Sequence, residues 1–99
     1  MTRYHLTLFV SGASERSSRA IADATAVCHR HLSGDYQLSV VDVHDDRRAA
    51  ATSGVLAVPT LVRNRPLPTR RITGDLSNAE KVLLALQLPP TRAAPAHGG

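Results

Sequence analysis

Few side chains in this 99-residue chain could act as nucleophiles or redox groups. The one cysteine, Cys28, excludes an intrachain disulfide, a Cys-x-x-Cys redox pair and a cysteine zinc cluster. Cys28 falls among apolar residues at helical spacing, which favours a small buried hydrophobe over a reactive thiolate. Catalysis by this lone sulfur is the less favoured interpretation.

The histidines, aspartates and serines form no recognisable catalytic or metal-binding motif. His29 and His31 are two residues apart in a helical segment and therefore point in different directions, and the other histidines are scattered along the chain. Asp42, Asp45 and Asp46 lie where a strand ends and a helix starts, where carboxylates usually serve as solvated caps. The serines before the long helical segment fit helix capping, and there is no Gly-x-Ser-x-Gly elbow. We therefore predict no catalytic residue, no metal and no cofactor.

Arginine is the chemically conspicuous side chain. The formal net charge is +4, and eleven arginines stand against one lysine. Four of the arginines fall within nine residues, with no acid between them: Arg63, Arg65, Arg70 and Arg71. Strand alternation places Arg63 and Arg65 on the same face of a strand.

This arginine group has two interpretations. Charged residues commonly keep an edge hairpin soluble. Alternatively, the planar guanidinium groups form a docking stripe for an acidic protein surface or a nucleic-acid backbone. Only 3% of the residues are aromatic, so stacking platforms for bases are scarce and nucleic acid is the weaker of these two partners. Solubility and protein docking both stay open.

The first half of the chain has the pattern of strand, helix and strand. Residues 4–10, YHLTLFV, and 36–44, YQLSVVDVH, are rich in strand-forming residues. Between them, apolar residues recur at helical spacing over about 17–32. Two strands joined by such a helix are parallel. Asp45 or Asp46 can then cap a short Ala-rich helix that runs through Ala51.

The second half predicts a hairpin and a last helix. Residues 60–65 and 70–73 read as antiparallel strands joined by PLPT. Ser77 followed by Glu80 has the spacing of a capping box, so we expect a helix from Ser77 to about Leu88. Two prolines end it, and the tail over 89–99 is expected to be disordered.

Pro59 stands where the third strand begins, a position at which a strand tolerates the missing N–H. We expect structural roles for Pro59, Gly74 and Asp75. The order β-α-β-α-β-β-α, with a proline at the mouth of the third strand, is that of the thioredoxin-like fold. We therefore predict an α/β domain over residues 1–88, with a mixed four-stranded sheet whose third strand runs against the first. A thioredoxin needs a thiol pair at the start of the first helix, where this chain has SGASERS.

Nothing in the sequence suggests a membrane protein. No apolar stretch approaches membrane-spanning length, and the first residues lack the core and cleavage site of a signal peptide. We expect a cytoplasmic protein.

Several segments together resemble the KaiB proteins of the bacterial circadian clock. They are LTLFVSG, SRA, YQLSVVDV, VLAVPTLV and, most specifically, PLPTRRITGDLSNAEKVLLAL, and they span about Tyr4 to Leu88. The chain is also similar to the KaiB-like sensor domain at the N-terminus of SasA histidine kinases. The resemblance implies a non-enzymatic protein that docks on the ring of a KaiC-type ATPase and regulates its phosphorylation state, in circadian timing or stress adaptation. The alternative is a free-standing sensor or adaptor of a two-component histidine kinase system.

The resemblance also indicates which side chains bind the partner. Arginines that match basic residues of the family, together with Arg65 from the arginine group, are the expected contacts: Arg19, Arg63, Arg65, Arg70 and Arg71.

Two folds are known for KaiB proteins, a ground state with a rearranged, oligomeric C-terminal half and a thioredoxin-like monomer that binds KaiC. Cyanobacterial members have glycine and aspartate where this chain has Ala85 and Gln87, which are better helix formers. We therefore predict that this chain rests mainly in the thioredoxin-like state, and we leave homo-oligomers open.

Overall fold

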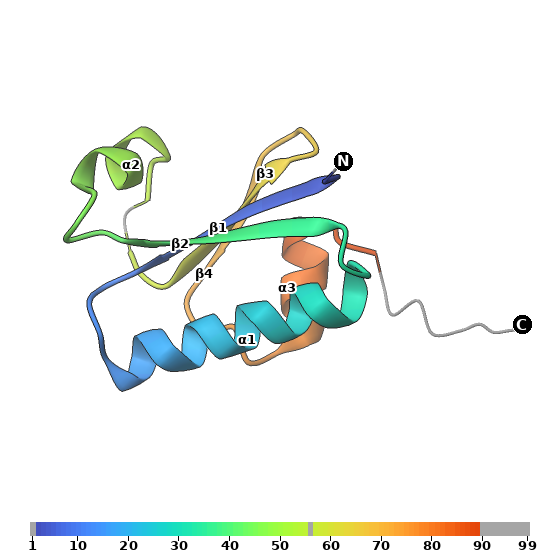
Figure 1. Ribbon diagram of the computed structural model, residues 1–99, viewed down its shortest axis with the longest axis horizontal. Helices are drawn as coiled ribbons and strands as arrows, with labels where there is room; N and C mark the ends of the chain where they lie inside the picture. The colour runs from blue at the N-terminus through green and yellow to red at the C-terminus, as the bar shows by residue number, and fades with distance from the viewer. Residues whose placement is uncertain (1, 56, 90–99) are drawn as a thin grey trace, which may run out of the picture.

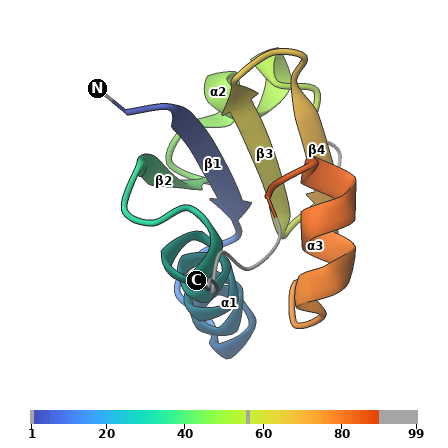
Figure 2. The same cartoon turned by 90° about the vertical axis from the view of Figure 1, so that its right-hand side faces the viewer.

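A four-stranded mixed sheet in the order β2-β1-β3-β4 forms the centre of the computed structural model (Figures 1 and 2). β1 (Tyr4–Val10) and β2 (Tyr36–Asp42) are parallel to each other. β3 (Thr60–Arg65) runs antiparallel to β1, and β4 (Arg70–Thr73) runs antiparallel to β3. The sheet has the strand directions that the sequence predicts, and β4 forms one of its edges.

The structure describes residues 2–55 and 57–89. Within them, three helices flank the sheet: α1 (Glu15–His31), α2 (Arg47–Thr52) and α3 (Ala79–Leu86). α1 and α3 lie on one side of the sheet, and α2 lies on the other side, near the C-terminal ends of β1 and β2 (Figure 1). The order β-α-β-α-β-β-α is confirmed. Most of the tail that the sequence predicts to be disordered, residues 90–99, lies outside the described residues.

The main core lies between the sheet and the two helices on its first side. Leu6, Leu8 and Leu61 point into it from the strands, and Val82 and Leu86 meet them from α3. Each of these side chains is at most 1% exposed. Burying a leucine or valine this fully contributes about 1.5–3 kcal/mol. The burial fixes which face of each strand points toward the helices, and so which residues remain on the other face.

The first two helices begin with the caps that their sequences suggest. The Ser14 side chain accepts a hydrogen bond from the backbone N–H of Ser17, and α1 begins at residue 15, two residues earlier than expected. The Asp46 carboxylate accepts a bond of 2.9 Å from the N–H of Ala49 and caps α2. Both caps satisfy donors that the first turn of a helix cannot pair internally.

The capping-box prediction for the last helix is wrong. Asn78 caps α3 by accepting a 3.2 Å hydrogen bond from the N–H of Lys81. Ser77 is engaged elsewhere, because its N–H and its hydroxyl both donate to the Asp75 carboxylate at 2.9 Å. At the other end, Gln87 ends the helix in the left-handed region, with φ of 51°, instead of continuing it.

Candidate docking site

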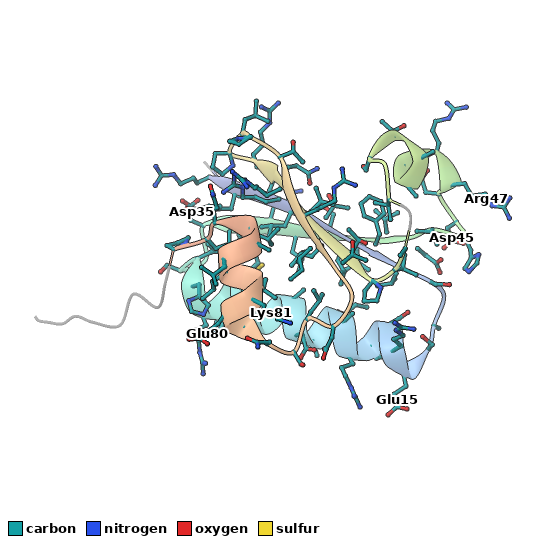
Figure 3. All side chains as sticks on the ribbon, turned by 180° about the vertical axis from the view of Figure 1, so that it is seen from behind. Glu15, Asp35, Asp45, Arg47, Glu80 and Lys81 are labelled. Atoms are coloured by element: carbon teal, nitrogen blue, oxygen red, sulfur yellow. The ribbon has the colours of Figure 1, made fainter. Side chains whose placement is uncertain are left out.

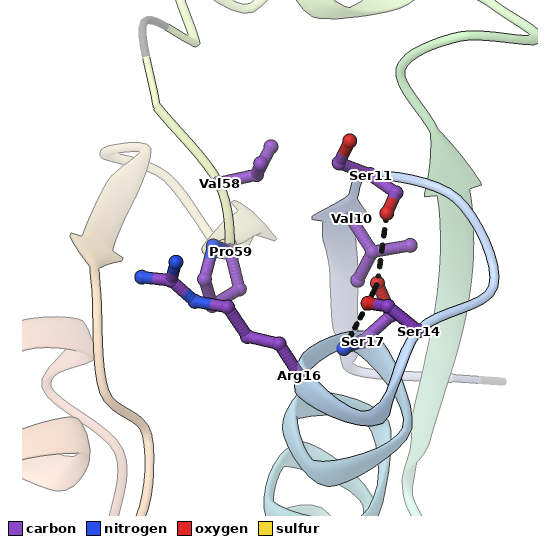
Figure 4. A pocket seen from close by; sticks show the side chains of 7 residues that line it. All are labelled: Val10, Ser11, Ser14, Arg16, Ser17, Val58 and Pro59. Atoms are coloured by element: carbon purple, nitrogen blue, oxygen red, sulfur yellow. Dashed lines mark hydrogen bonds between the residues drawn. The ribbon is translucent and has the colours of Figure 1, made fainter.

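The start of α1 faces Pro59 across a cleft of about 300 Å³ (Figure 4). Pro59 is buried, and the Val58–Pro59 peptide bond is cis. Arg16 extends from the first turn of α1 toward Pro59 (Figure 4). In a thioredoxin-like fold this is the place of the reactive thiol pair. Here serines occupy it, so the cleft has the shape of such a site without its nucleophile.

The serines in the cleft form hydrogen bonds within the β1–α1 loop and the first turn of α1. Ser14 caps α1 and also donates its hydroxyl to Ser17 Oγ at 3.1 Å. Ser17 is 6% exposed and donates its own hydroxyl to the backbone oxygen of Ser11 at 3.2 Å. These bonds hold the β1–α1 loop against the helix (Figure 4). The capping interpretation is confirmed for Ser14.

Ser11 and His44 form a pair that sequence reasoning missed. Ser11 Oγ lies 2.7 Å from His44 Nε2, although the two residues are 33 positions apart. A Ser–His pair can act as nucleophile and base when a carboxylate orients the imidazole ring. Asp42 instead accepts the backbone N–H of His44 at 2.9 Å, a bond that is the main cause of the lowered pKa of Asp42. In the described part of the chain no carboxylate orients the ring, so the pair joins two loops without completing a catalytic triad.

Cys28 is a core residue. Its side chain is 0% exposed and belongs to the apolar cluster under the sheet. Burial raises the pKa of the Cys28 thiol to about 11. Because the thiolate is the nucleophilic form, this thiol is unreactive at neutral pH. The interpretation of Cys28 as a small buried hydrophobe is confirmed.

A β-bulge separates Arg63 from Arg65. Arg63 lies opposite Leu6 and Arg65 lies opposite His5, so Asn64 is an extra residue between the two pairs. Residues directly opposite in a sheet share a face, so Arg65 shares the face of His5 and Arg63 that of Leu6. The expectation that Arg63 and Arg65 share a face is therefore wrong.

Arg63 is buried beneath the hairpin. It is 4% exposed, and its two terminal nitrogens donate to the backbone oxygens of Gln87 at 3.3 Å and Pro68 at 2.7 Å. Gln87 stands at the C-terminal end of α3, where the helix dipole favours a positive charge. Arg63 thus ties the β3–β4 turn to α3. The structure places it among the structural residues, apart from the exposed arginines.

Arg70 and Arg71 are exposed on β4, at the edge of the sheet. Arg70 lies opposite Arg63 and so faces the side of α3, while Arg71 lies opposite Val62 on the other side. The Arg71 guanidinium donates to the backbone oxygen of Gly54 at 2.9 Å, which positions it over the segment that follows α2. The two neighbouring arginines therefore flank the sheet edge from opposite faces.

Arg19 lies across a second hollow, of about 210 Å³, that shares Arg16 and Pro59 with the first and is also lined by Gly74 and Asp75. Its side chain is 69% exposed, and its guanidinium lies 3.8 Å from the Glu15 carboxylate in an exposed ion pair that contributes little to stability. The hollow begins directly after β4. The structure therefore brings Arg19 close to the residues that directly follow β4, the strand that carries Arg70 and Arg71.

The turn after β4 has a fixed conformation. Gly74 has φ of +103°, a region that side-chain-bearing residues rarely adopt, and its N–H donates to the backbone oxygen of Pro59 at 2.9 Å. The two hydrogen bonds from Ser77 are the main causes of the lowered pKa of Asp75, with smaller contributions from the positive charges of Arg19 and Lys81. Pro59, Gly74 and Asp75 thus meet around one hollow.

The described residues contain no group of three histidine, cysteine, aspartate or glutamate side chains that could hold a metal ion. Figure 3 shows Asp45 near α2 and Asp35 near the opposite end of the molecule. No helix in the described ranges is long and apolar enough to cross a membrane.

The KaiB domain family matches residues 7–88, most of the part that forms the sheet and helices. The chain belongs to the KaiB family. The circadian clock protein KaiB3 of Synechocystis sp. is 39% identical over 90 residues, which are 91% of this chain and 88% of that protein. The circadian clock oscillator protein KaiB of Thermostichus vulcanus is 42% identical over 85 residues, covering 86% of this chain and 79% of that protein.

Solved structures support the same fold for this KaiB-family chain. The N-terminal domain of SasA from Synechococcus elongatus superposes with a TM-score of 0.72 and 20% identity, over 88% of this chain and 86% of that domain. Mitochondrial thioredoxin 3 of Saccharomyces cerevisiae gives a TM-score of 0.68 and 16% identity, over 88% of this chain and 79% of the thioredoxin. At these identities the likeness concerns the fold alone, and it confirms the thioredoxin-like prediction.

Proposed function

We propose that this protein is a non-enzymatic module that docks on the ring of a KaiC-type ATPase and regulates its phosphorylation state, in circadian timing or stress adaptation. Membership of the KaiB family over residues 7–88 is the observation that carries the proposal. The site chemistry agrees with it. The cleft that would hold a reactive thiol has serines engaged in capping, and the one cysteine is buried.

The docking surface in this proposal runs from the β4 edge to α1. Arg70 and Arg71 flank the edge strand, and the hollow lined by Gly74 and Asp75 leads to Arg19 and Arg16. We propose Arg19, Arg70 and Arg71 as partner contacts, with Arg65 at the far end of β3 as an outlying one. Guanidinium groups make bidentate bonds to carboxylates, so the complementary surface on the ATPase is acidic.

The test is direct binding of the full chain to the KaiC-type ATPase of the same host, with ATP or ADP bound. A double variant, Arg70→Glu and Arg71→Glu, is expected to weaken binding by about tenfold or more, because two attractive charges become repulsive. Arg30→Glu is the control for a single charge reversal, since Arg30 is also exposed but lies in the last turn of α1, outside the proposed surface. Its effect should stay within about twofold, and raising the salt concentration should weaken the unmodified complex.

Two outcomes would redirect the proposal. If the ATPase is not bound in either nucleotide state while a histidine kinase of the host is, the chain is an adaptor of a two-component system. The thioredoxin-like arrangement shared with the SasA domain makes that the second candidate. Turnover of a thiol substrate that Cys28→Ser abolishes would instead make the protein an enzyme.

A further inference from the structure

The face of the sheet opposite α1 and α3 is only partly covered. α2 lies over the C-terminal ends of β1 and β2, whereas the N-terminal end of β1 has no helix above it (Figure 1). In the open part lies a hollow of about 340 Å³ whose walls come from three strands. Its polar lining residues are His5, Thr7, Gln37, Ser39, Asn64 and Arg65.

The β-bulge assembles this hollow. Without the extra residue Asn64, strand alternation would put Arg65 on the helix-covered face together with Arg63. The bulge brings Arg65 to the side of His5, its direct partner on β1. Bulges that redirect a side chain in this way occur often next to functional sites.

The lining is rich in hydrogen-bond donors and contains no carboxylate. Thr7 Oγ1 donates to Asn64 Oδ1 at 2.7 Å, which engages the amide oxygen and leaves the amide nitrogen of Asn64 as a donor. Arg65, Gln37 and Ser39 add further donors from the neighbouring strands, and all three are exposed. A hollow that offers several donors and no carboxylate favours the binding of an anion.

We propose that this hollow binds a phosphate group. Donors converge on it from three strands, which suits a tetrahedral anion with acceptor oxygens in several directions better than a planar carboxylate. Arg65 supplies the positive charge and Asn64 the oriented amide. The site lies on the face of the sheet away from α1 and α3, and it shares Arg65 with the docking surface proposed above.

The test is an NMR titration of the full ¹⁵N-labelled chain with inorganic phosphate, at constant ionic strength maintained with chloride. We expect saturable amide shifts confined to the lining residues of β1, β2 and β3. Arg65→Ala should weaken binding about fivefold or more, because it removes the charged donor. Thr7→Val, which keeps the side-chain shape but frees the Asn64 oxygen, should weaken it by about twofold to threefold.

Arg48→Ala is the control, because it removes the same charge from an exposed position on α2. Shifts spread over all exposed arginines, or equal losses for Arg48→Ala and Arg65→Ala, would overturn the proposal. The absence of saturation would also overturn it.

A second experiment uses a glycine-flanked phosphothreonine peptide and its unphosphorylated counterpart. If the phosphopeptide binds more tightly than inorganic phosphate, the natural ligand is a phosphorylated protein. If it binds equally or more weakly, the natural ligand is free phosphate.

Discussion

The two faces of the sheet differ in how completely they are buried. The face under α1 and α3 is closely packed, with Leu6, Leu8 and Leu61 at most 1% exposed, and the charged Arg63 is buried at one end of it. The opposite face changes character along its length. Phe9 and Val62 are buried on it, whereas the other end carries polar side chains around an open hollow. Among residues 2–55 and 57–89, the helix on that side is α2, which has six residues, so only part of the face needs to be apolar.

Arg63 and Arg65 show what this difference does to one residue type. They are two positions apart in one strand, but Arg63 is 4% exposed and bonded to backbone oxygens, while Arg65 is exposed at the hollow. The charge of an arginine therefore does not assign its role. Its role depends on the face of the sheet that it occupies, and here the extra residue Asn64 determines that face.

The largest expected effect comes from exchanging these arginines for alanine. Arg63→Ala should lower the free energy of unfolding by about 3 kcal/mol, because it removes two partly buried hydrogen bonds, to the backbone oxygens of Gln87 and Pro68, and opens a cavity. Arg65→Ala should change it by less than about 0.5 kcal/mol, as is usual for an exposed side chain. Urea unfolding followed by circular dichroism measures both values.

Arg63→Met sharpens this comparison. Methionine fills much of the same volume but donates no hydrogen bond, so a loss nearly as large as that of Arg63→Ala would assign the stability to the hydrogen bonds. A loss near zero for Arg63→Ala would contradict the structural role of the residue and return it to the candidate partner contacts.

The next effect concerns the thiol beneath the helix-covered face and its dependence on pH. The pKa of Cys28 rises from its ordinary value of 9.0 to about 11 in the folded state. The folded state therefore favours the neutral thiol. This contribution to stability is about 3 kcal/mol below pH 9.0, and it is lost as the pH rises from 9.0 to about 11.

The measurement compares the unfolding free energy of the parent chain and Cys28→Ala between pH 8 and pH 11. The two proteins share every other ionisable group, so the difference between the two curves isolates the thiol. We expect the advantage of the parent chain to shrink as the pH rises. Parallel curves would mean that the thiol is more exposed than the structure has it.

Much of the fold could be predicted because it rests on local periodicity. Alternation over 4–10 and helical spacing over about 17–32 each depend on neighbours in the sequence, and both segments form β1 and α1 with boundaries shifted by no more than two residues. Ser14 and Asp46 act as caps through bonds that span three residues. Such signals survive folding because tertiary contacts seldom compete with them.

The features that sequence reasoning missed depend on competition or on distant partners. Ser77 has the spacing of a cap, but Asp75, two residues away, takes both of its donors, and Asn78 caps α3 instead. The bulge at Asn64 appears only when β3 is paired with β1, so alternation within β3 alone misplaces Arg65. The first choice is a competition between two local motifs, and the second depends on strand pairing that no pattern within β3 encodes.

The smallest expected effect concerns the competition for Ser77 in the exposed turn between β4 and α3, where Ser77 can either bond Asp75 or cap α3. The pKa of Asp75 lies below its ordinary value of 3.8, because its carboxylate accepts bonds from the N–H and the hydroxyl of Ser77. A lowered pKa stabilises the folded state above pH 3.8, and this stability is lost as the pH falls through the folded-state pKa.

The variant Ser77→Ala removes the hydrogen bond from the hydroxyl and keeps the one from the backbone N–H. An NMR titration of the Asp75 carboxyl carbon should therefore show the midpoint rising toward 3.8 without reaching it. An unchanged midpoint would mean that the Ser77 hydroxyl is available to cap α3 after all, and then Asn78→Ala should cost the helix little.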